Sequence, residues 1–339
     1  MDMQTEQAYS VIKSAVLGHA VGDALGVPVE FVSRERLLRS PVTDMLAYGS
    51  HNVPAGTWSD DTSMTLCTLE SLTHAGKVDL DDMMNRFVMW SNSGYMTPSG
   101  KMFGIGRSTF HAIGKYRRNH SVDDCGGRSE RDNGNGSLMR IIPVILYQHF
   151  ATSINTYGKE QIEEIYAVSA LTHAHPRSEA ACGIYAFIVN ELLHEHSMVS
   201  LEKGLKKASI YYASHPEYPM FSRLFSGELH MVDMSEIRSS GYVVDTLEAA
   251  VWCVLTTESY QGCVLKAISL GGDTDTIAAI AGGLAGLLYG FYSIPESWLS
   301  ALALQEKLDA MCMDAAVQWA EKSFPLGTVP EKERFSRNN

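Results

Sequence analysis

The 339-residue chain lacks an excess of basic residues. It carries 27 lysines and arginines against 39 aspartates and glutamates, which gives a formal net charge of −12. A nucleic-acid-binding surface is basic, so this balance argues against nucleic acid as the main partner and leaves only a local basic patch open. The sequence contains no Lys/Arg-rich run that would mark such a patch.

Paired cysteines and phosphate-binding signatures are also missing. The six cysteines lie at positions 67, 125, 182, 253, 263 and 312, and none of them forms a C-x-x-C pair. This spacing disfavours a structural zinc site on cysteine and favours a reduced, intracellular compartment. The Walker motif G-x-x-x-x-G-K-[ST] does not occur, which removes the commonest nucleotide-phosphate loop.

Targeting and membrane signals are weak. The first seven residues are acidic where a secretory signal would be basic. Residues 277–295 carry no charge, but the stretch is rich in glycine and alanine, is only marginally long enough and stands alone. We therefore expect a buried core helix, a cytoplasmic protein and no membrane partner.

The apolar share of 45% and the charged share of 19% are typical of a packed globular protein. Apolar residues recur at helical spacing and alternating strand patterns are scarce, which predicts an all-α fold. We expect one domain over residues 1–329 and a polar tail over 330–339. The predicted helices are Glu6–Gly26, Thr62–Ala75, Leu80–Trp90, Ile162–Ala170, Arg177–His194, Leu201–Ala213, Asp245–Thr256, Tyr260–Leu270, Thr276–Tyr292 and Glu296–Phe324. Residues 32–56 are predicted to be irregular, and residues 91–137 to form glycine-rich binding loops.

Glycines spaced by four residues mark the first predicted helix and a late one. They are Gly18, Gly22 and Gly26 in the first helix, and Gly282, Gly286 and Gly290 in the late one. Glycine destabilises a helix interior, so two such stripes predict surfaces at which other helices approach closely.

Two acidic groups stand where helices are predicted to begin. They are Ser59-Asp60-Asp61 and Asp273-Thr274-Asp275-Thr276. One carboxylate or hydroxyl at each position would be enough to cap a helix. Four carboxylates brought together would repel one another and raise their own pKa values unless a cation lay between them. An all-oxygen ligand set suits magnesium, manganese or calcium, so we expect a site for one or two hard cations if the groups meet.

The second acidic group is not an EF-hand loop. Counted from Asp273, loop position six is Ala278 where glycine is needed, and position twelve is Leu284 where a bidentate glutamate is needed. The surplus of oxygen ligands therefore needs another explanation.

Three further motifs have both a structural and a functional interpretation. The turn 133–137, Asn-Gly-Asn-Gly-Ser, could direct backbone amides at an anion or be an ordinary Asn-Gly turn. His173 and His175, followed by Glu179, are interpreted as capping or ligand-facing residues, because no predicted strands surround them for a barrel-type metal site. His19 and Asp23, four residues apart, could pair in the core.

Glu30 lies between Val29 and Phe31. A buried carboxylate there would have a raised pKa and serve as a general acid or base. An exposed glutamate is the alternative, and the sequence does not separate the two.

Taken together and in order, these segments resemble the ADP-ribosylglycohydrolase family, which includes the dinitrogenase reductase-activating glycohydrolases. The resemblance covers roughly residues 14–292. It rests on the residues Gly22-Asp23-Ala24-Leu25-Gly26, Glu30, Trp58-Ser59-Asp60-Asp61-Thr62, Gly134-Asn135-Gly136-Ser137, Met139-Arg140, Thr172-His173 and Gly271-Gly272-Asp273-Thr274-Asp275-Thr276.

The resemblance implies an orthogonal all-helical bundle around a dinuclear metal centre with two Mg²⁺ ions, or Mn²⁺ in their place. The implied metal ligands are Ser59, Asp60, Asp61, Asp273, Asp275 and Thr276. The implied substrate-binding residues are Gly134, Asn135, Gly136, Ser137, Met139, Arg140, His173 and Gly100. Glu30 and the metal-site residues Asp60 and Asp61 are the implied catalytic residues.

The implied activity is magnesium-dependent hydrolysis that removes ADP-ribose from a modified protein side chain, of the arginine or serine type, or from a small conjugate. One departure affects the linkage. Relatives that act on ADP-ribosyl-arginine often carry Phe-Asp-Ile-Gly where this chain has Phe103-Gly104-Ile105-Gly106. The alternatives are a non-catalytic ADP-ribose-binding or structural relative and a metal-dependent phosphohydrolase.

Overall fold

Short polar residues begin several helices of this protein, and glycines end several. In the computed structural model, the Ser59 and Asp79 side chains cap the two helices that follow them. Gly76 and Gly94, both with positive φ, end those helices in the left-handed conformation that glycine adopts most easily. The all-α prediction is confirmed.

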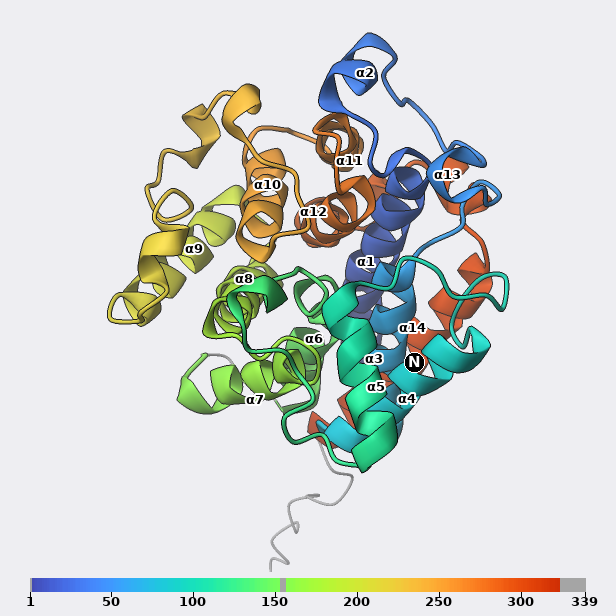
Figure 1. The fold of residues 1–339 in the computed structure, drawn as a ribbon, viewed down its shortest axis with the longest axis vertical. Helices are drawn as coiled ribbons and strands as arrows, with labels where there is room; N and C mark the ends of the chain where they lie inside the picture. The colour runs from blue at the N-terminus through green and yellow to red at the C-terminus, as the bar shows by residue number, and fades with distance from the viewer. Residues whose placement is uncertain (1, 153–156, 324–339) are drawn as a thin grey trace, which may run out of the picture.

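The structure describes residues 2–152 and 157–323, so the predicted polar tail lies outside the described residues. The described ranges contain three isolated β-bridges but no strand. Figure 1 shows the helical arrangement. The α-helices are α1 Met3–Gly26, α2 Arg34–Arg39, α3 Asp60–Ala75, α4 Leu80–Ser93, α5 Arg107–Asn119, α6 Ile142–Thr152, α7 Lys159–Ala170, α8 Pro176–His194, α9 Met198–Tyr212, α10 Val243–Leu255, α11 Tyr260–Ser269, α12 Thr274–Tyr289, α13 Glu296–Ala301 and α14 Gln305–Ser323.

Helices α1 and α12 lie side by side near the centre of the molecule and run antiparallel (Figure 1). A Cβ atom on Gly22 would overlap the Ala278 carbonyl, and one on Gly26 would overlap the backbone of Asp275. The expectation of close helix contact is therefore confirmed for the first glycine stripe and for its partners Gly282 and Gly286. Gly290 instead ends α12 with a φ of +79° and makes no such contact.

The other helices surround this central pair. Helix α14 packs against α1, α10 and α11 pack against α12, and α3 packs against α4 and α14. The core between these helices includes fully buried tryptophans at positions 58, 90, 298 and 319. None of the described helices is both long and apolar enough to cross a bilayer. The uncharged segment is mostly α12, buried as a core helix.

Three short helices were not predicted. Helix α5 lies in the stretch interpreted as loops. It escaped prediction because Gly106 at its N-cap gives no side-chain capping signal. Helix α6 lies in a continuous apolar run that has no helical periodicity to read. Helix α2 is only six residues long.

The single helix predicted over residues 296–324 is wrong, because the chain breaks between α13 and α14. Leu304 adopts a φ of +49°, and the Ala303 amide donates to the Gly56 carbonyl at 3.0 Å. The loop at Gly56 therefore packs into the break. The predicted end of this helix, Phe324, lies outside the described residues.

The packing of α1 on α12 leads to a stability prediction. We expect Gly22→Ala to lower the free energy of unfolding by about 2–3 kcal/mol, because the added methyl group would force two backbones apart. The matched control is Gly114→Ala in the middle of α5, where a Cβ meets only the end of the Arg118 side chain at 3.5 Å. There we expect a gain of up to about 1 kcal/mol from helix propensity. Urea unfolding of both variants tests the pair, and equal effects would contradict the packing account.

Candidate functional site

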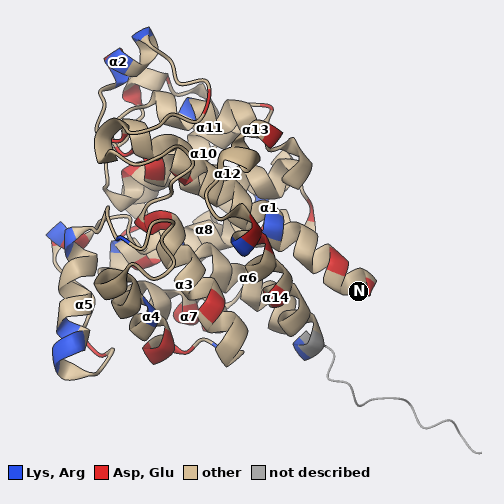
Figure 2. Cartoon of the chain, turned by 90° about the vertical axis from the view of Figure 1, so that its right-hand side faces the viewer, with Lys and Arg blue, Asp and Glu red and all other residues tan. Residues whose placement is uncertain are grey.

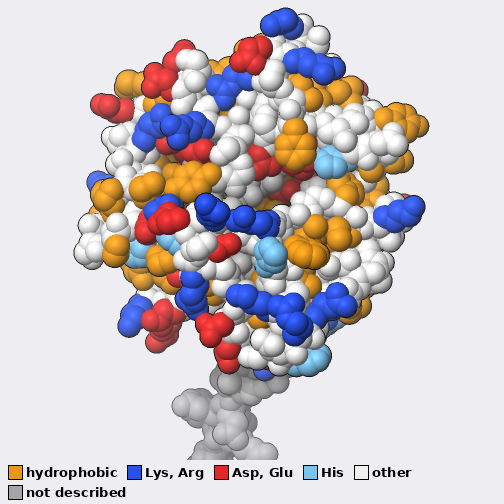
Figure 3. All heavy atoms as spheres, in the orientation of Figure 1, with side chains coloured by type: hydrophobic (Ala, Val, Ile, Leu, Met, Phe, Trp, Pro, Cys, Tyr) orange, Lys and Arg blue, Asp and Glu red, His pale blue; other side chains and the backbone are white. Residues whose placement is uncertain are grey.

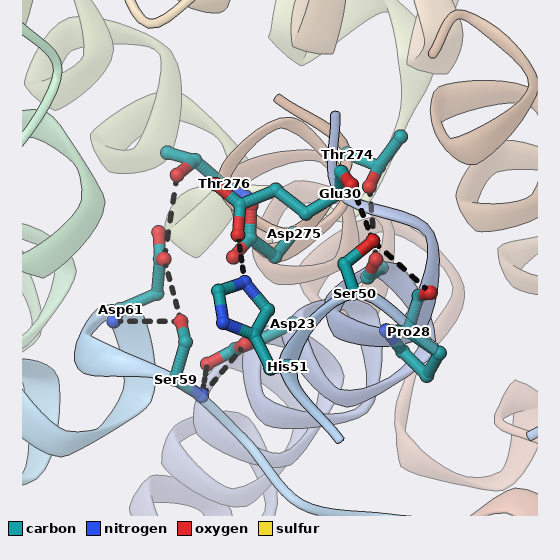
Figure 4. A network of polar contacts seen from close by, with 11 residues as sticks. Asp23, Pro28, Glu30, Ser50, His51, Ser59, Asp61, Thr274, Asp275 and Thr276 are labelled. Carbon is teal, nitrogen blue, oxygen red and sulfur yellow. Dashed lines mark hydrogen bonds and ion pairs between the residues drawn. The ribbon is translucent and has the colours of Figure 1, made fainter. Parts of the chain in front are cut away.

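Three carboxylates from three helices meet at one end of the α1–α12 contact. Asp23 lies in the last turns of α1, Asp61 in the first turn of α3 and Asp275 in the first turn of α12. Each offers an oxygen that lies within 4.8 Å of the other two, and all three side chains are buried. The structure thus brings the two acidic groups of the sequence together and adds Asp23 to them (Figure 4).

Asp23 holds the start of α3 in place. Its carboxylate accepts hydrogen bonds from the Ser59 amide at 3.0 Å, the Thr62 amide at 3.0 Å and the Thr62 hydroxyl at 2.6 Å. Burial raises the pKa of Asp23 to about 6. The considered pairing with His19 is not formed, since His19 lies 3.4 Å from the Thr65 hydroxyl instead. The i, i+4 spacing pointed to the wrong partner for Asp23.

Asp60 and Asp61 occupy the first turn of α3. Burial and then the charge of Asp23 raise the pKa of both carboxyl groups well above the ordinary value. One oxygen of Asp61, Oδ2, accepts from the hydroxyls of Ser59 at 2.9 Å and Thr276 at 3.3 Å. The other, Oδ1, is buried and has no hydrogen-bond partner among the described residues.

The turn before α12 positions the second acidic group. Gly271 and Gly272 both have positive φ, and a Cβ on Gly272 would overlap the Ser239 carbonyl. The turn places the Asp273 carboxylate 2.6 Å from the side-chain amide nitrogen of Asn135, which donates a hydrogen bond to it. Burial raises the pKa of Asp273, and burial followed by the charge of Asp61 raises that of Asp275 well above its ordinary value.

Glu30 is buried just after α1, and the imidazole of His51 contacts its carboxylate (Figure 4). Sequence reasoning missed His51, which stands in the stretch predicted to be irregular. Its turn has positive φ at Tyr48, Gly49 and Asn52. The Ser50 hydroxyl in that turn donates to the Glu30 carbonyl at 2.6 Å.

The turn that carries His51 packs backbone against backbone on the segment that carries Glu30. A Cβ on Gly49 would overlap the Pro28 carbonyl, so only glycine fits there. Two residues with side chains, Tyr48 and Asn52, adopt the unfavourable left-handed region. Backbone strain of this kind persists where the surroundings enforce it, often at functional sites.

Glu30 and the carboxylates of the two acidic groups, but not Asp23 or His51, line a cavity of about 620 Å³. Figure 3 shows acidic side chains inside a hollow of the surface and basic ones at its rim. The cavity is lined by Glu30, Phe31, Asp60, Asp61, Gly104, Ile105, Gly106, Arg107, Ser108, Thr109, Arg131, Gly134, Asn135, Gly136, Met139, His173, Ser239, Ser240, Gly241, Gly272, Asp273, Asp275 and Thr276. Its two cationic lining residues are Arg107 and Arg131.

Not every predicted substrate-binding residue lines the cavity. Gly134, Asn135, Gly136, Met139 and His173 do so. Ser137 and Arg140 do not line it. Ser137 is buried behind the wall with its hydroxyl 2.8 Å from that of Ser169, and Arg140 is buried, donating to the Thr172 hydroxyl at 2.8 Å. Gly100 is exposed and does not line the cavity. Ser59, a predicted metal ligand, is buried and does not line it either.

The segment 239–241 contributes to the cavity although it was not predicted. The Asp273 amide donates to the Ser239 carbonyl at 3.0 Å, and the Asn135 amide donates to the Gly241 carbonyl at 3.1 Å. The segment thereby ties the glycine turn to the acidic group. A Ser-Ser-Gly turn before the predicted helix 245–256 was the available signal.

Gly104 replaces the carboxylate expected from arginine-specific relatives, and the structure shows a space constraint at this position. Its φ is +85°, and a Cβ would overlap Oδ1 of Asp60. The loop therefore lies directly against Asp60, and any side chain at position 104 would require the loop or Asp60 to move.

The acidic cluster has the chemistry of a hard-cation site. Its ligand atoms are oxygens except for the His51 imidazole nitrogen, two groups of three side chains are close enough to hold an ion, and Asp61 Oδ1 is buried without a hydrogen-bond partner among the described residues. The two groups are Asp23, Asp61 and Asp275, and Glu30, His51 and Asp275. An uncompensated buried carboxylate is strongly destabilising, so a cation would satisfy what the protein leaves open.

The family model described as ADP-ribosylglycohydrolase matches residues 4–324. ADP-ribosylarginine hydrolase Tri1 of Serratia proteamaculans is 33% identical, with 92% of this chain and 80% of the relative covered. ADP-ribosyl-[dinitrogen reductase] glycohydrolase of Rhodospirillum rubrum is 30% identical, with 86% and 90% covered. The solved structure of an ADP-ribosylglycohydrolase-related protein complex superposes with a TM-score of 0.76 at 28% identity, covering 94% of this chain and 99% of that one.

His173 in the cavity wall leads to a pH prediction. Burial, and then the nearby charge of Arg140, lower the pKa of His173 to about 3. The folded protein keeps this imidazole neutral, whereas the unfolded chain protonates it below about pH 6.5. Protonation therefore stabilises only the unfolded chain, so the free energy of unfolding is unaffected by His173 above that pH and falls as the pH drops below it.

Between pH 7.5 and 5.5 we expect the parent protein to lose about 1 kcal/mol more unfolding free energy than His173→Gln, which removes the titrating group. Urea unfolding at both pH values measures the difference. The other buried histidines contribute equally to parent and variant. An equal loss in the two proteins would contradict a neutral, buried His173.

Proposed function

The chain belongs to the ADP-ribosylglycohydrolase family of glycosidic-bond hydrolases, and on that premise we propose a magnesium-dependent enzyme that removes ADP-ribose from arginine side chains of modified proteins. The observation that carries the proposal is the convergence of buried carboxylates from α1, α3 and α12 beside one cavity. Carboxylate and hydroxyl oxygens are the ligands that Mg²⁺ and Mn²⁺ take in proteins.

The ions would be held by carboxylates and hydroxyls that the structure brings together. We assign the ligands to Ser59, Asp60, Asp61, Asp273, Asp275 and Thr276, and two Mg²⁺ ions to the site. When bound, the cations would supply Lewis-acid polarisation of oxygen atoms at the reacting centre. The Thr276 and Ser59 hydroxyls orient Asp61 by donating to one of its oxygens.

The proposed reaction breaks the bond between the anomeric carbon of the distal ribose and the side-chain nitrogen. The oxygen of a water molecule forms the new bond to that carbon, and a proton of the water ends on the leaving nitrogen. The transition state is oxocarbenium-like, as in other glycoside cleavage. Glu30, buried and lining the cavity, is the proposed group that takes the proton from water, with Asp60 and Asp61 as further catalytic carboxylates.

The other wall of the cavity suits the ADP part of the substrate. Gly134 and Gly136 expose backbone without side chains, and Arg131 and Arg107 bring positive charge to the same cavity. Amides in a glycine turn and guanidinium groups both bind phosphate oxygens. We propose that this wall holds the pyrophosphate, with His173 as a neutral contact.

The bond proposed to be cleaved is the one to arginine, with an O-linked bond as the second candidate. Relatives that are 33% and 32% identical carry the name ADP-ribosylarginine hydrolase, which favours arginine. Gly104 favours the second candidate, an O-linked substrate such as ADP-ribosyl-serine, because the carboxylate of arginine-specific relatives is missing there. A panel of arginine-, serine- and ester-linked ADP-ribosyl peptides with the purified protein decides between them.

The metal assignment predicts a loss of activity and of magnesium response. We expect Asp60→Asn and Asp275→Asn each to lower release of ADP-ribose from a modified protein by about 100-fold or more, since each removes a ligand oxygen and a charge. Added Mg²⁺ should raise the melting temperature of the parent protein and raise it much less in the variants.

Asp123→Asn is the matched control, because Asp123 is exposed and lies away from the lining residues. Unchanged turnover and an unchanged magnesium shift in both site variants would rule out the metal assignment. Release of phosphate or AMP in place of ADP-ribose would instead indicate a phosphohydrolase.

His51 is proposed as a positioning residue for Glu30. We expect His51→Leu to lower kcat about tenfold or more with little change in KM, because the carboxylate loses its fixed orientation while substrate contacts stay. His51→Gln places an amide N–H near the same point and should restore most of the loss. Steady-state kinetics of both variants is the measurement, and equal losses in the two would point to a general structural defect.

A further inference from the structure

Helix α5 carries a basic stripe in an otherwise acidic protein. Its exposed surface includes Arg107, Phe110, His111, Arg117 and Arg118, and the helix contains no aspartate or glutamate. The opposite surface, with Ala112, Ile113 and Tyr116, is buried. Figure 2 shows basic residues, in blue, at both ends of α5. This exposed surface is called the α5 stripe below.

The cations of the α5 stripe form no ion pair among the described residues, although Asp132, which accepts a hydrogen bond from the Ser108 hydroxyl at 3.0 Å, lies near Arg107. Within residues 2–152 and 157–323, no carboxylate lies within 4.0 Å of a nitrogen of Arg107, Arg117 or Arg118. The chain has 39 acidic residues available for pairing, so this segregation is notable. The neighbouring carboxylate of Asp124 is 3.6 Å from Arg128 instead.

Helix stability explains only part of this arrangement. Arg117 and Arg118 stand in the last turn of α5, where a cation interacts favourably with the helix dipole. Arg107 is the first residue of the helix, where the dipole disfavours a cation, and it has no acidic residue in its turn. Phe110 is 59% exposed on the same surface and adds an apolar side chain to the arginines, although single exposed apolar side chains are common on folded proteins.

The α5 stripe begins at the mouth of the cavity. Arg107, Ser108 and Thr109 in the first turn of the helix line the cavity together with Arg131 from a neighbouring loop. The Arg107 guanidinium donates to the Arg131 carbonyl at 2.9 Å, which joins the two segments. Figure 3 shows basic side chains at the rim of the hollow and again below it. A protein whose modified side chain enters the cavity would therefore lie across α5.

We propose that the α5 stripe docks an acidic protein surface that flanks the ADP-ribosylated side chain. The proposal rests on the proposed function, because it requires a modified protein as the substrate. Opposite charges across such a contact raise the association rate and select partners. An exposed aromatic among arginines is typical of the centre of a protein interface. Nucleic acid is disfavoured, because the net charge of −12 and the acidic cavity beside the stripe repel a polyanion.

The test compares ADP-ribosyl-arginine peptides whose flanks are acidic or neutral, together with free ADP-ribosyl-arginine. We expect the parent protein to have a lower KM for the acidic peptide, and Arg117→Gln/Arg118→Gln to raise that KM about five- to tenfold and abolish the preference. Hydrolysis of free ADP-ribosyl-arginine should be unchanged in this variant, since neither residue lines the cavity. Fluorescence anisotropy of the labelled acidic peptide, with and without 0.5 M NaCl, gives its affinity without relying on turnover.

The matched control is Arg36→Gln/Arg39→Gln, two exposed arginines in the last turn of α2, which lies away from α5 (Figure 1). An acidic-peptide preference that survives in the α5 variant, or that the α2 control abolishes equally, would overturn the proposal. A mixed-sequence DNA oligonucleotide that binds the stripe more tightly than the acidic peptide would also overturn it. If no linkage is hydrolysed but the acidic peptide binds and the α5 variant abolishes binding, the docking surface stands and the proposed activity fails.

Discussion

The structure depends on the direct backbone contact between α1 and α12. Gly22 and Gly26 remove the side chains that would separate the two helices, and the backbone of Asp275 lies against Gly26 as a result. The Thr274 hydroxyl at the start of α12 donates to the Gly26 carbonyl at 2.9 Å and fixes the register of the contact. This register brings Asp23 and Asp275, which are distant in sequence, into one buried group of carboxylates together with Asp61. The third helix, α3, joins the site because Asp23 caps it.

This arrangement concentrates like charges in a buried place, which folding alone disfavours. Burial and mutual repulsion raise the pKa of the carboxyl groups at positions 60, 61, 273 and 275. Such a cluster is stable when a hard cation neutralises it. The cavity beside it also carries guanidinium groups, so it is acidic in one part and basic in another. An ADP-ribosylated arginine has a matching pair of features, an anionic pyrophosphate and a cationic guanidinium.

The sequence predicted α1, α3, α4, α8 and α12, and a side chain caps the start of the first four of these helices. It did not predict α5 or α6, whose caps or periodicity are weak, and it did not detect the break between α13 and α14, which the loop at Gly56 imposes from elsewhere in the chain. Local signals do not report such long-range packing.

The acidic groups of the site could be predicted because carboxylates and hydroxyls exceeded what helix capping needs. The contributions of Asp23 and His51 to the site could not be predicted. Asp23 looked like a partner of His19 on the same helix, and only the position of α3 shows that it caps another helix. His51 lies in a turn with unusual backbone angles, and its contact with Glu30 depends on packing between two irregular segments. The basic stripe escaped notice because Arg107 is separated in sequence from Arg117 and Arg118, and the three gather on one surface only in the folded helix.

We propose that the carboxylates at the meeting point of α1, α3 and α12 bind a hard divalent cation. The most direct measurement is an anomalous difference map from crystals grown with Mn²⁺, collected with an ADP-ribose-soaked crystal for comparison. We expect anomalous density within bonding distance of oxygens of Asp61 and Asp275, in the cavity beside Glu30. A well-ordered acidic cluster without anomalous density, in crystals that contain Mn²⁺, would contradict it.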